Sequence, residues 1–259
     1  TFGNASSFHG FGRDAKNVLD KSRAQVASLI NTKSNEIYFT AGGTESDNWA
    51  IEGVAFANKA KGNHIITSKI EHHAVLHTCE YLEKHHGFEV TYLDVDAEGR
   101  IRVEDVENAI KDNTILITIM FANNEVGTIQ PIKEIGEIAK KHKVIFHTDA
   151  VQAAGNIHID VKELNVDLMS MSSHKIYGPK GIGALYIKTG VKLHSFVHGG
   201  AQERRRRAGT ENMPSVVGYG KAAEIAKNTM DEHIERLTSL RTKLIDGILE
   251  KIPYTRVNG

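Results

Sequence analysis

Residues 115–121, Ile115-Leu116-Ile117-Thr118-Ile119-Met120-Phe121, form the stretch that decides the fold class. This run is apolar at nearly every position, which is typical of a β-strand buried on both of its faces. Strands of this kind occur in parallel sheets that are covered by helices on both sides. The run therefore predicts the centre of a covered sheet.

The chain on either side of this run alternates between strand and helix patterns. Short runs rich in β-branched and aromatic residues predict further strands at 36–40, 64–68, 88–93, 144–148, 166–171 and 183–187. Apolar residues at helical spacing predict helices at 15–30, 44–61, 72–85 and 132–142. Helical crossovers between strands favour parallel pairing. We therefore predict an α/β fold, a three-layer α/β/α sandwich with a mostly parallel sheet.

From Val216 onward the strand alternation stops and one long amphipathic helix is expected. We predict a large domain over residues 1–228, then a connecting helix and the beginning of a smaller C-terminal domain over 229–259. The sequence starts at Thr1 without a methionine and stops just after Ile252-Pro253-Tyr254, which is typical of the approach to a new strand. We therefore expect both ends of the chain to be incomplete.

The composition excludes several classes of protein. The 259 residues include 32 Lys plus Arg and 32 Asp plus Glu, so the formal net charge is zero. A neutral chain has no overall field that attracts nucleic acid or an anionic membrane, and we expect neither as a partner. The single cysteine, Cys79, cannot form an intramolecular disulfide, and no apolar run is long enough to span a bilayer. These features predict a cytoplasmic protein.

Ligands of parallel α/β sheets bind beyond the carboxyl ends of the strands, so the residues that follow each strand are candidates for the site. Thr40-Ala41-Gly42-Gly43-Thr44-Glu45-Ser46 is a glycine turn that leads into a helix. Its free N–H groups and the Thr44 hydroxyl suit an anion such as a phosphate, although Thr44 could equally serve as a helix cap. His72 and His73 follow the next strand, where a ring could stack on a cofactor. His73 and His77 have zinc-pair spacing, but the missing Glu signature and cysteine cluster favour surface histidines and no metal site.

One acidic and one basic candidate complete this set of site residues. Asp149 follows the apolar Val144-Ile145-Phe146, where an ionised carboxylate needs a cation, although it could also cap the next helix. Lys175 lies behind another apolar strand and is flanked by hydroxyl and imidazole groups, so it is a candidate Schiff-base former. An anion-binding turn, a stacking ring, an acid and an amine are together what pyridoxal chemistry requires.

These motifs also resemble a known family, and the resemblance covers nearly the whole chain. The segments that carry it are 40–46, Glu71-His72-His73-Ala74-Val75, Asn123-Asn124-Glu125-Val126-Gly127, Asp149-Ala150-Val151-Gln152, 172–181 (Ser-Ser-His-Lys-Ile-Tyr-Gly-Pro-Lys-Gly) and 207–212 (Arg-Ala-Gly-Thr-Glu-Asn). The set is similar to NifS/IscS-type cysteine desulfurases, in the class V branch of the fold-type I pyridoxal-phosphate enzymes. The resemblance implies pyridoxal 5′-phosphate as cofactor. It also implies a desulfurase that converts L-cysteine to L-alanine and leaves an enzyme persulfide, for iron–sulfur cluster assembly or tRNA thiolation.

The resemblance also implies a role for each site residue. Lys175 would bind the cofactor as a Schiff base and act as a catalytic base, and His72 would stack on the ring and assist proton transfer. Asp149 would keep the pyridine nitrogen protonated, and Gln152 would face the phenolic oxygen. The remaining cofactor-binding residues would be Gly43, Thr44, Ser172 and His174 at the phosphate, Asn124 beside the cofactor and substrate, and Thr210 at the phosphate of the neighbouring subunit in a homodimer. A sulfur acceptor or scaffold protein would be a further partner.

Some expected parts of the family pattern are absent from this sequence. The family's nucleophilic cysteine and substrate-carboxylate arginine are expected beyond Gly259, and we interpret Cys79 as a small buried residue within a helix. The run Arg204-Arg205-Arg206-Arg207 is interpreted as a solvated loop in a neutral protein. Another class V activity, such as an aminotransferase or selenocysteine lyase, stays open, as does an incomplete fragment that acts as a dimerisation or binding module.

Overall fold

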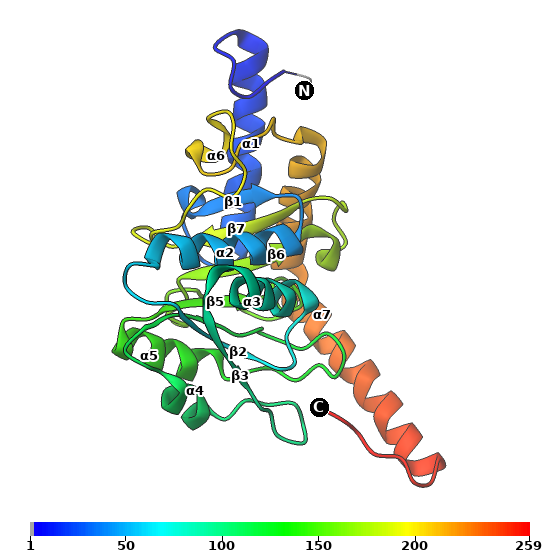
Figure 1. The fold of residues 1–259 in the computed structure, drawn as a ribbon. Helices are drawn as coiled ribbons and strands as arrows, with labels where there is room; N and C mark the ends of the chain where they lie inside the picture. Colours follow the sequence, from blue (N-terminus) through cyan, green and yellow to red (C-terminus); the bar gives the residue numbers. More distant parts are fainter. Residues whose placement is uncertain (1–2) are drawn as a thin grey trace.

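The computed structural model describes residues 3–259, in which seven strands form one mixed sheet (Figure 1). In chain order the strands are β1 (Ile37–Thr40), β2 (His64–Ser68), β3 (Glu89–Leu93), β4 (Thr114–Thr118), β5 (Ile145–Asp149), β6 (Leu168–Ser172) and β7 (Gly183–Ile187). Their order across the sheet is β1-β7-β6-β5-β4-β2-β3. β7 is antiparallel to both of its neighbours, and the other four pairings are parallel. The predicted mostly parallel sheet is confirmed.

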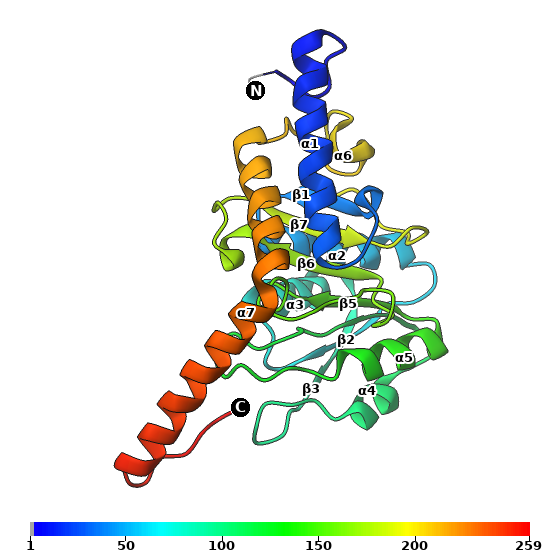
Figure 2. The same cartoon turned by 180° about the vertical axis from the view of Figure 1, so that it is seen from behind.

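Helices cover both faces of this sheet, which confirms the three-layer prediction. α2 (Gly43–Asn58) and α3 (His73–His86) lie on one face (Figure 1). The opposite face carries α1 (Gly10–Leu29), α4 (Val103–Ala109), α5 (Ile132–His142) and the first half of α7 (Met213–Lys251); Figure 2 shows α1 and α7 from this side. Each face buries its own apolar core, one around Phe146, the other around Trp49. Burying both faces is the reason that residues 115–121 are apolar at nearly every position.

Four short elements were not predicted: the 3-10 turn η1 (Ser34–Glu36), α4, the 3-10 turn η2 and α6 (Gln202–Arg205). α4 has only seven residues, so its helical spacing of Val103, Val106 and Ile110 is too short a pattern to distinguish from a loop. The 3-10 turn η2 (Ser173–Ile176) follows β6 directly, and Tyr177 ends it with a left-handed φ of 63°. β4 also ends at Thr118 rather than at the predicted Phe121. Beyond Thr118 the backbone still follows β5, where the N–H of Phe121 donates to the carbonyl of Asp149 at 2.8 Å.

α7 is continuous for 39 residues and crosses the predicted boundary at 228 without a break. Its buried residues end at Met230, and the apolar side chains of Leu237, Leu240 and Leu244 beyond that point are exposed. Figure 2 shows this second half leaving the side of the sheet. The division into domains at residue 228 stays a prediction. Within residues 3–259, no helix has the length and apolar character that a membrane crossing requires.

Candidate active site

A cavity of about 210 Å³ lies at the carboxyl edge of the parallel strands. The segments that follow β1, β2, β4, β5 and β6 all contribute to its wall. The predicted site residues in this wall are Gly43, Thr44, His72, Asn124, Asp149, Gln152, Ser172, His174 and Lys175. Thr210 is exposed and lies outside the wall. Topology brings the set together, because parallel strands end at one edge of the sheet.

Asp149 and Lys175 lie in the same cavity, on the ends of the adjacent strands β5 and β6. The Asp149 carboxyl is 6% exposed, and burial raises its pKa above the ordinary value. A hydrogen bond from the N–H of Val151 at 2.9 Å and the charges of His72 and Lys175 oppose this rise in pKa. The alternative that Asp149 caps a following helix is wrong, because the chain after β5 forms turns and no helix begins before β6, although one carboxyl oxygen accepts this N–H. Asp149 and Lys175 nevertheless line the same cavity.

His72 occupies the N-cap position of α3, which fixes its ring. Its Nδ1 accepts a hydrogen bond from the N–H of Ala74 at 3.1 Å. Because Nδ1 is the acceptor, the proton of a neutral ring lies on Nε2. The ring is therefore held at the rim of the cavity with its other nitrogen available.

The glycine turn at the start of α2 forms another part of the wall. Gly42 is the N-cap residue, so the alternative that Thr44 caps the helix is wrong. The Thr44 side chain is instead exposed in the first turn of α2. A Cβ on Gly43 would lie 2.8 Å from Cγ2 of Val151, so glycine permits the close approach of this turn to the end of β5. Across the cavity, the Ser172 hydroxyl and Nδ1 of His174 are 2.9 Å apart. These donors and the helix N-terminus suit an anion.

Three buried polar residues in or near the cavity wall were missed from the sequence. Asp47 in α2 is 1% exposed, and no described residue offers its Oδ1 a hydrogen-bond partner. Burial, and after it the charge of Asp149, raise its pKa well above normal. His147 lies 3.8 Å from this oxygen, and burial lowers its pKa to about 3. Burial raises the pKa of Glu71 to about 8. A signal for His147 did exist, because it lies two positions before Asp149 on the same face of β5.

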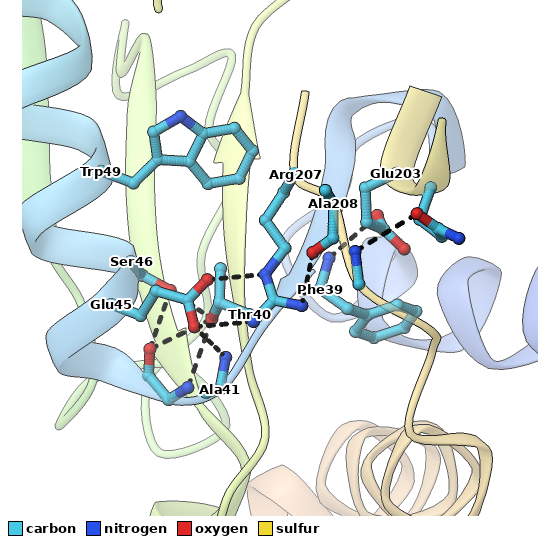
Figure 3. Close-up of polar contacts among 12 residues, drawn as sticks. Phe39, Thr40, Ala41, Glu45, Ser46, Trp49, Glu203, Arg207 and Ala208 are labelled. Atoms are coloured by element: carbon cyan, nitrogen blue, oxygen red, sulfur yellow. Dashed lines mark hydrogen bonds and ion pairs between the residues drawn. The ribbon is translucent and has the colours of Figure 1, made fainter. Parts of the chain in front are cut away.

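The four arginines at 204–207 are not a uniformly solvated loop, and that interpretation is corrected. Arg204 and Arg205 are exposed, but the guanidinium of Arg204 stacks 4.0 Å from the ring centroid of Tyr38. Arg207 forms a two-pronged ion pair with Glu45 at 2.7 and 3.0 Å (Figure 3). Cation–π and bidentate contacts of this kind bind the run to β1 and α2.

Cys79 lies within α3 and is fully buried, as predicted. Burial raises the pKa of its thiol above the ordinary value, so the thiolate needed for nucleophilic attack is disfavoured. His73 and His77 stack on each other with centroids 5.0 Å apart. Over residues 3–259, no group of three or more His, Cys, Asp or Glu side chains could hold a metal ion.

Comparison with known proteins gives consistent results. The aminotransferase class-V family model matches residues 1–259. The chain is 58% identical over 258 residues to the cysteine desulfurase IscS of Clostridium botulinum and 60% identical to that of Methanosarcina thermophila. It is covered completely in both alignments but spans only 65% and 63% of the lengths of these relatives.

Solved structures show the same relationship. A NifS-like protein superposes with a TM-score of 0.93 at 42% identity, over 96% of this chain and 68% of the other. DndA from Streptomyces lividans superposes with a TM-score of 0.87 at 37% identity, over 96% and 71%. The fold, the cavity and the family match over residues 1–259 lead to one conclusion: this chain belongs to the class V aminotransferase family, whose members depend on pyridoxal 5′-phosphate.

Proposed function

We propose that this chain forms the cofactor-binding part of a cysteine desulfurase, which converts L-cysteine to L-alanine and transfers the sulfur to an enzyme cysteine, where it forms a persulfide. The persulfide would serve iron–sulfur cluster assembly or tRNA thiolation. The observation that carries this proposal is the presence of Asp149 and Lys175 in one cavity. The relatives named IscS favour a desulfurase over the other class V activities.

The residues of the cavity fit pyridoxal 5′-phosphate. An amine, a carboxyl and an anion-binding helix start surround one space, and these match the aldehyde, ring nitrogen and phosphate of the cofactor. The absence of a Cβ at Gly43 keeps the turn close to Val151. The orphaned Oδ1 of Asp47 adds a buried acceptor at the floor.

Each end of the cofactor then has named partners. The N–H groups at Gly43 and Thr44, with the side chains of Ser172 and His174, would hold the phosphate. Gln152 would face the phenolic oxygen, and Asn124 would lie beside the substrate.

When bound, the cofactor withdraws electrons from the substrate Cα through its protonated ring. Asp149 would hold the proton on the ring nitrogen, since an adjacent carboxylate stabilises that cation. Lys175 would bind the aldehyde covalently until substrate replaces it, and its freed amine would take the proton at Cα. His72, with Nε2 available, would assist this transfer.

The partners are part of the same proposal. A homodimer would allow the exposed Thr210 to reach the phosphate of the neighbouring subunit's cofactor. A sulfur acceptor or scaffold protein would receive the persulfide sulfur.

Borohydride trapping tests the proposal. The purified protein should be yellow, and borohydride should remove its absorbance band and attach the cofactor to the peptide that contains Lys175. Lys175→Ala should remove the band. Alanine release from L-cysteine in the presence of a thiol reductant should then be measured on a protein that also carries the segment expected beyond Gly259, where the nucleophilic cysteine is expected. A protein that stays colourless with saturating cofactor would refute the site, and a yellow protein with that segment that releases no alanine would refute the desulfurase activity alone.

A further inference from the structure

The glycine turn at the start of α2 is held from outside the cavity. The Glu45 carboxylate, which directly follows Thr44, accepts the N–H of Ala41 at 2.8 Å, on the other side of the turn. The hydroxyls of Thr40 and Ser46 lie 2.8 Å apart across its base. Figure 3 shows these contacts converging on the turn. Glu45 is therefore the side chain that joins the two arms of the turn next to its glycines.

Glu45 is in turn bound by Arg207. Nε of Arg207 donates to Oε1 of Glu45 at 2.7 Å, and Nη2 donates to Oε2 at 3.0 Å (Figure 3). The two side chains are 22% and 14% exposed, so water screens the pair only in part. This pairing has an electrostatic consequence. An unpaired carboxylate one residue from a phosphate site would repel the phosphate, and the guanidinium cancels that charge.

The segment that presents Arg207 is itself conformationally constrained. Glu203, Arg204 and Arg205 have left-handed φ values of 44°, 57° and 65°, which non-glycine residues adopt at a cost. A buried ion pair keeps them there: Arg23 donates to both carboxylate oxygens of Glu203 at 2.6 and 2.8 Å. The N–H of Phe39 donates to the same carboxylate at 3.1 Å. A backbone fixed in this way holds Arg207 against Glu45.

We propose that Arg207 is a positioning residue that acts through Glu45, shaping the 42–44 turn and cancelling a charge beside it so that the turn binds the cofactor's phosphate. Arg207 itself lies outside the cavity wall. The inference rests on the proposed function, because it assumes a phosphate at this turn. Asp47 lines the adjoining cavity, and its buried Oδ1 has no hydrogen-bond partner among residues 3–259, a second observation that favours a ligand there.

The experiment compares two ligands that differ only in the phosphate. Pyridoxal 5′-phosphate and pyridoxal are titrated into cofactor-depleted protein, and the dissociation constants are measured by absorbance. Arg207→Met should weaken pyridoxal 5′-phosphate binding about tenfold, the size of an uncompensated charge beside a helix N-terminus. Pyridoxal binding should change less than twofold. The double variant Glu45→Gln/Arg207→Met should recover part of the lost affinity, because it also removes the repelling carboxylate.

Lys188→Met is the matched control, since it breaks the Lys188–Asp167 pair at the end of β7 away from the cavity. It should leave both constants unchanged. Arg207→Lys keeps the positive charge and replaces Arg207→Met in the experiment if the methionine variant does not fold. It should weaken the binding of pyridoxal 5′-phosphate less than Arg207→Met does. Equal weakening for both ligands, or a double variant no better than Arg207→Met, would overturn the inference and leave the proposed function intact. If the wild-type protein binds neither ligand, the cofactor site itself is refuted and the inference with it.

Discussion

Glu71 gives the sharpest prediction, because it lies buried below the cavity with one oxygen unpartnered by any described residue. Its Oε1 accepts the Ser68 hydroxyl at 2.6 Å and the N–H of Met120 at 3.0 Å, which joins the ends of β2 and β4. Burial raises its pKa to about 8, against 4.5 for the ordinary group, so the native protein carries a neutral acid here at pH 7. Glu71→Gln mimics this neutral acid at every pH.

The magnitude follows from proton linkage. Below pH 4.5 the folded and unfolded chains both hold the proton, and the stabilising contribution is present in full. As the pH rises from 4.5 to about 8, the unfolded chain releases the proton from Glu71 while the folded chain keeps it. This difference favours the unfolded chain, so the contribution of Glu71 to the unfolding free energy is lost. The interval is roughly 3.5 pH units, and at about 1.4 kcal/mol per unit the loss is about 5 kcal/mol. The glutamine variant lacks this loss.

Urea unfolding between pH 5 and pH 8.5, at steps of about half a unit, measures the effect. The difference in unfolding free energy, variant minus wild type, should rise steadily across this window. Glu36→Gln is the control. Burial raises the pKa of Glu36, but hydrogen bonds from Thr32 and Thr189 outweigh it and lower the net pKa, so its pH dependence lies at more acid pH. Parallel profiles for wild type and Glu71→Gln would refute the buried neutral acid.

Three further changes test the site and its frame. Glu203→Gln should destabilise the fold by about 3–5 kcal/mol in urea unfolding, because it leaves the buried Arg23 charge uncompensated; Arg23→Met/Glu203→Met should be milder, and equal losses would contradict this. Gly183→Ala should lower the melting temperature by several degrees, since its Cβ would lie 2.7 Å from the backbone carbon of Gly42 and about 1–3 kcal/mol would be lost; an unchanged melting temperature would show that the turn can move. Asp149→Asn should retain cofactor but slow exchange of the substrate Cα proton on the order of a hundredfold, measured by NMR in D₂O, and an unchanged exchange rate would rule out its role at the ring nitrogen.

Much of the fold could be predicted from local pattern. The apolar strands and amphipathic helices carry strong periodicity, because the sheet buries both of its faces. The antiparallel direction of β7 was not predicted, although the segment 173–182, which joins β6 to β7, is too short and lacks the α-helix that a parallel crossover needs. α4 was missed because it has only seven residues, and a helical pattern of two turns is too short to be distinguished from a loop.

The site shows the same limit at the level of side chains. Asp149 and Lys175 could be predicted because each follows an apolar strand, where a charge is conspicuous. Asp47 and Glu71 were missed because their burial comes from the packing of α2 and of the segment after β2, which the sequence does not display. Arg207 was misinterpreted for a related reason: its partner Glu45 lies 162 positions away along the chain.

The place of β1 in the sheet also bears on how the protein is made. β1 pairs with β7, so Thr40 meets Gly183 although most of the chain separates them. During synthesis the glycine turn after β1 therefore leaves the ribosome long before β7, the strand that pairs with β1. Forming a contact between segments so far apart along the chain is slow. The anion-binding corner should be among the last parts of the nascent protein to form. Cofactor added during synthesis would then meet Lys175 and its turn only once β7 has emerged.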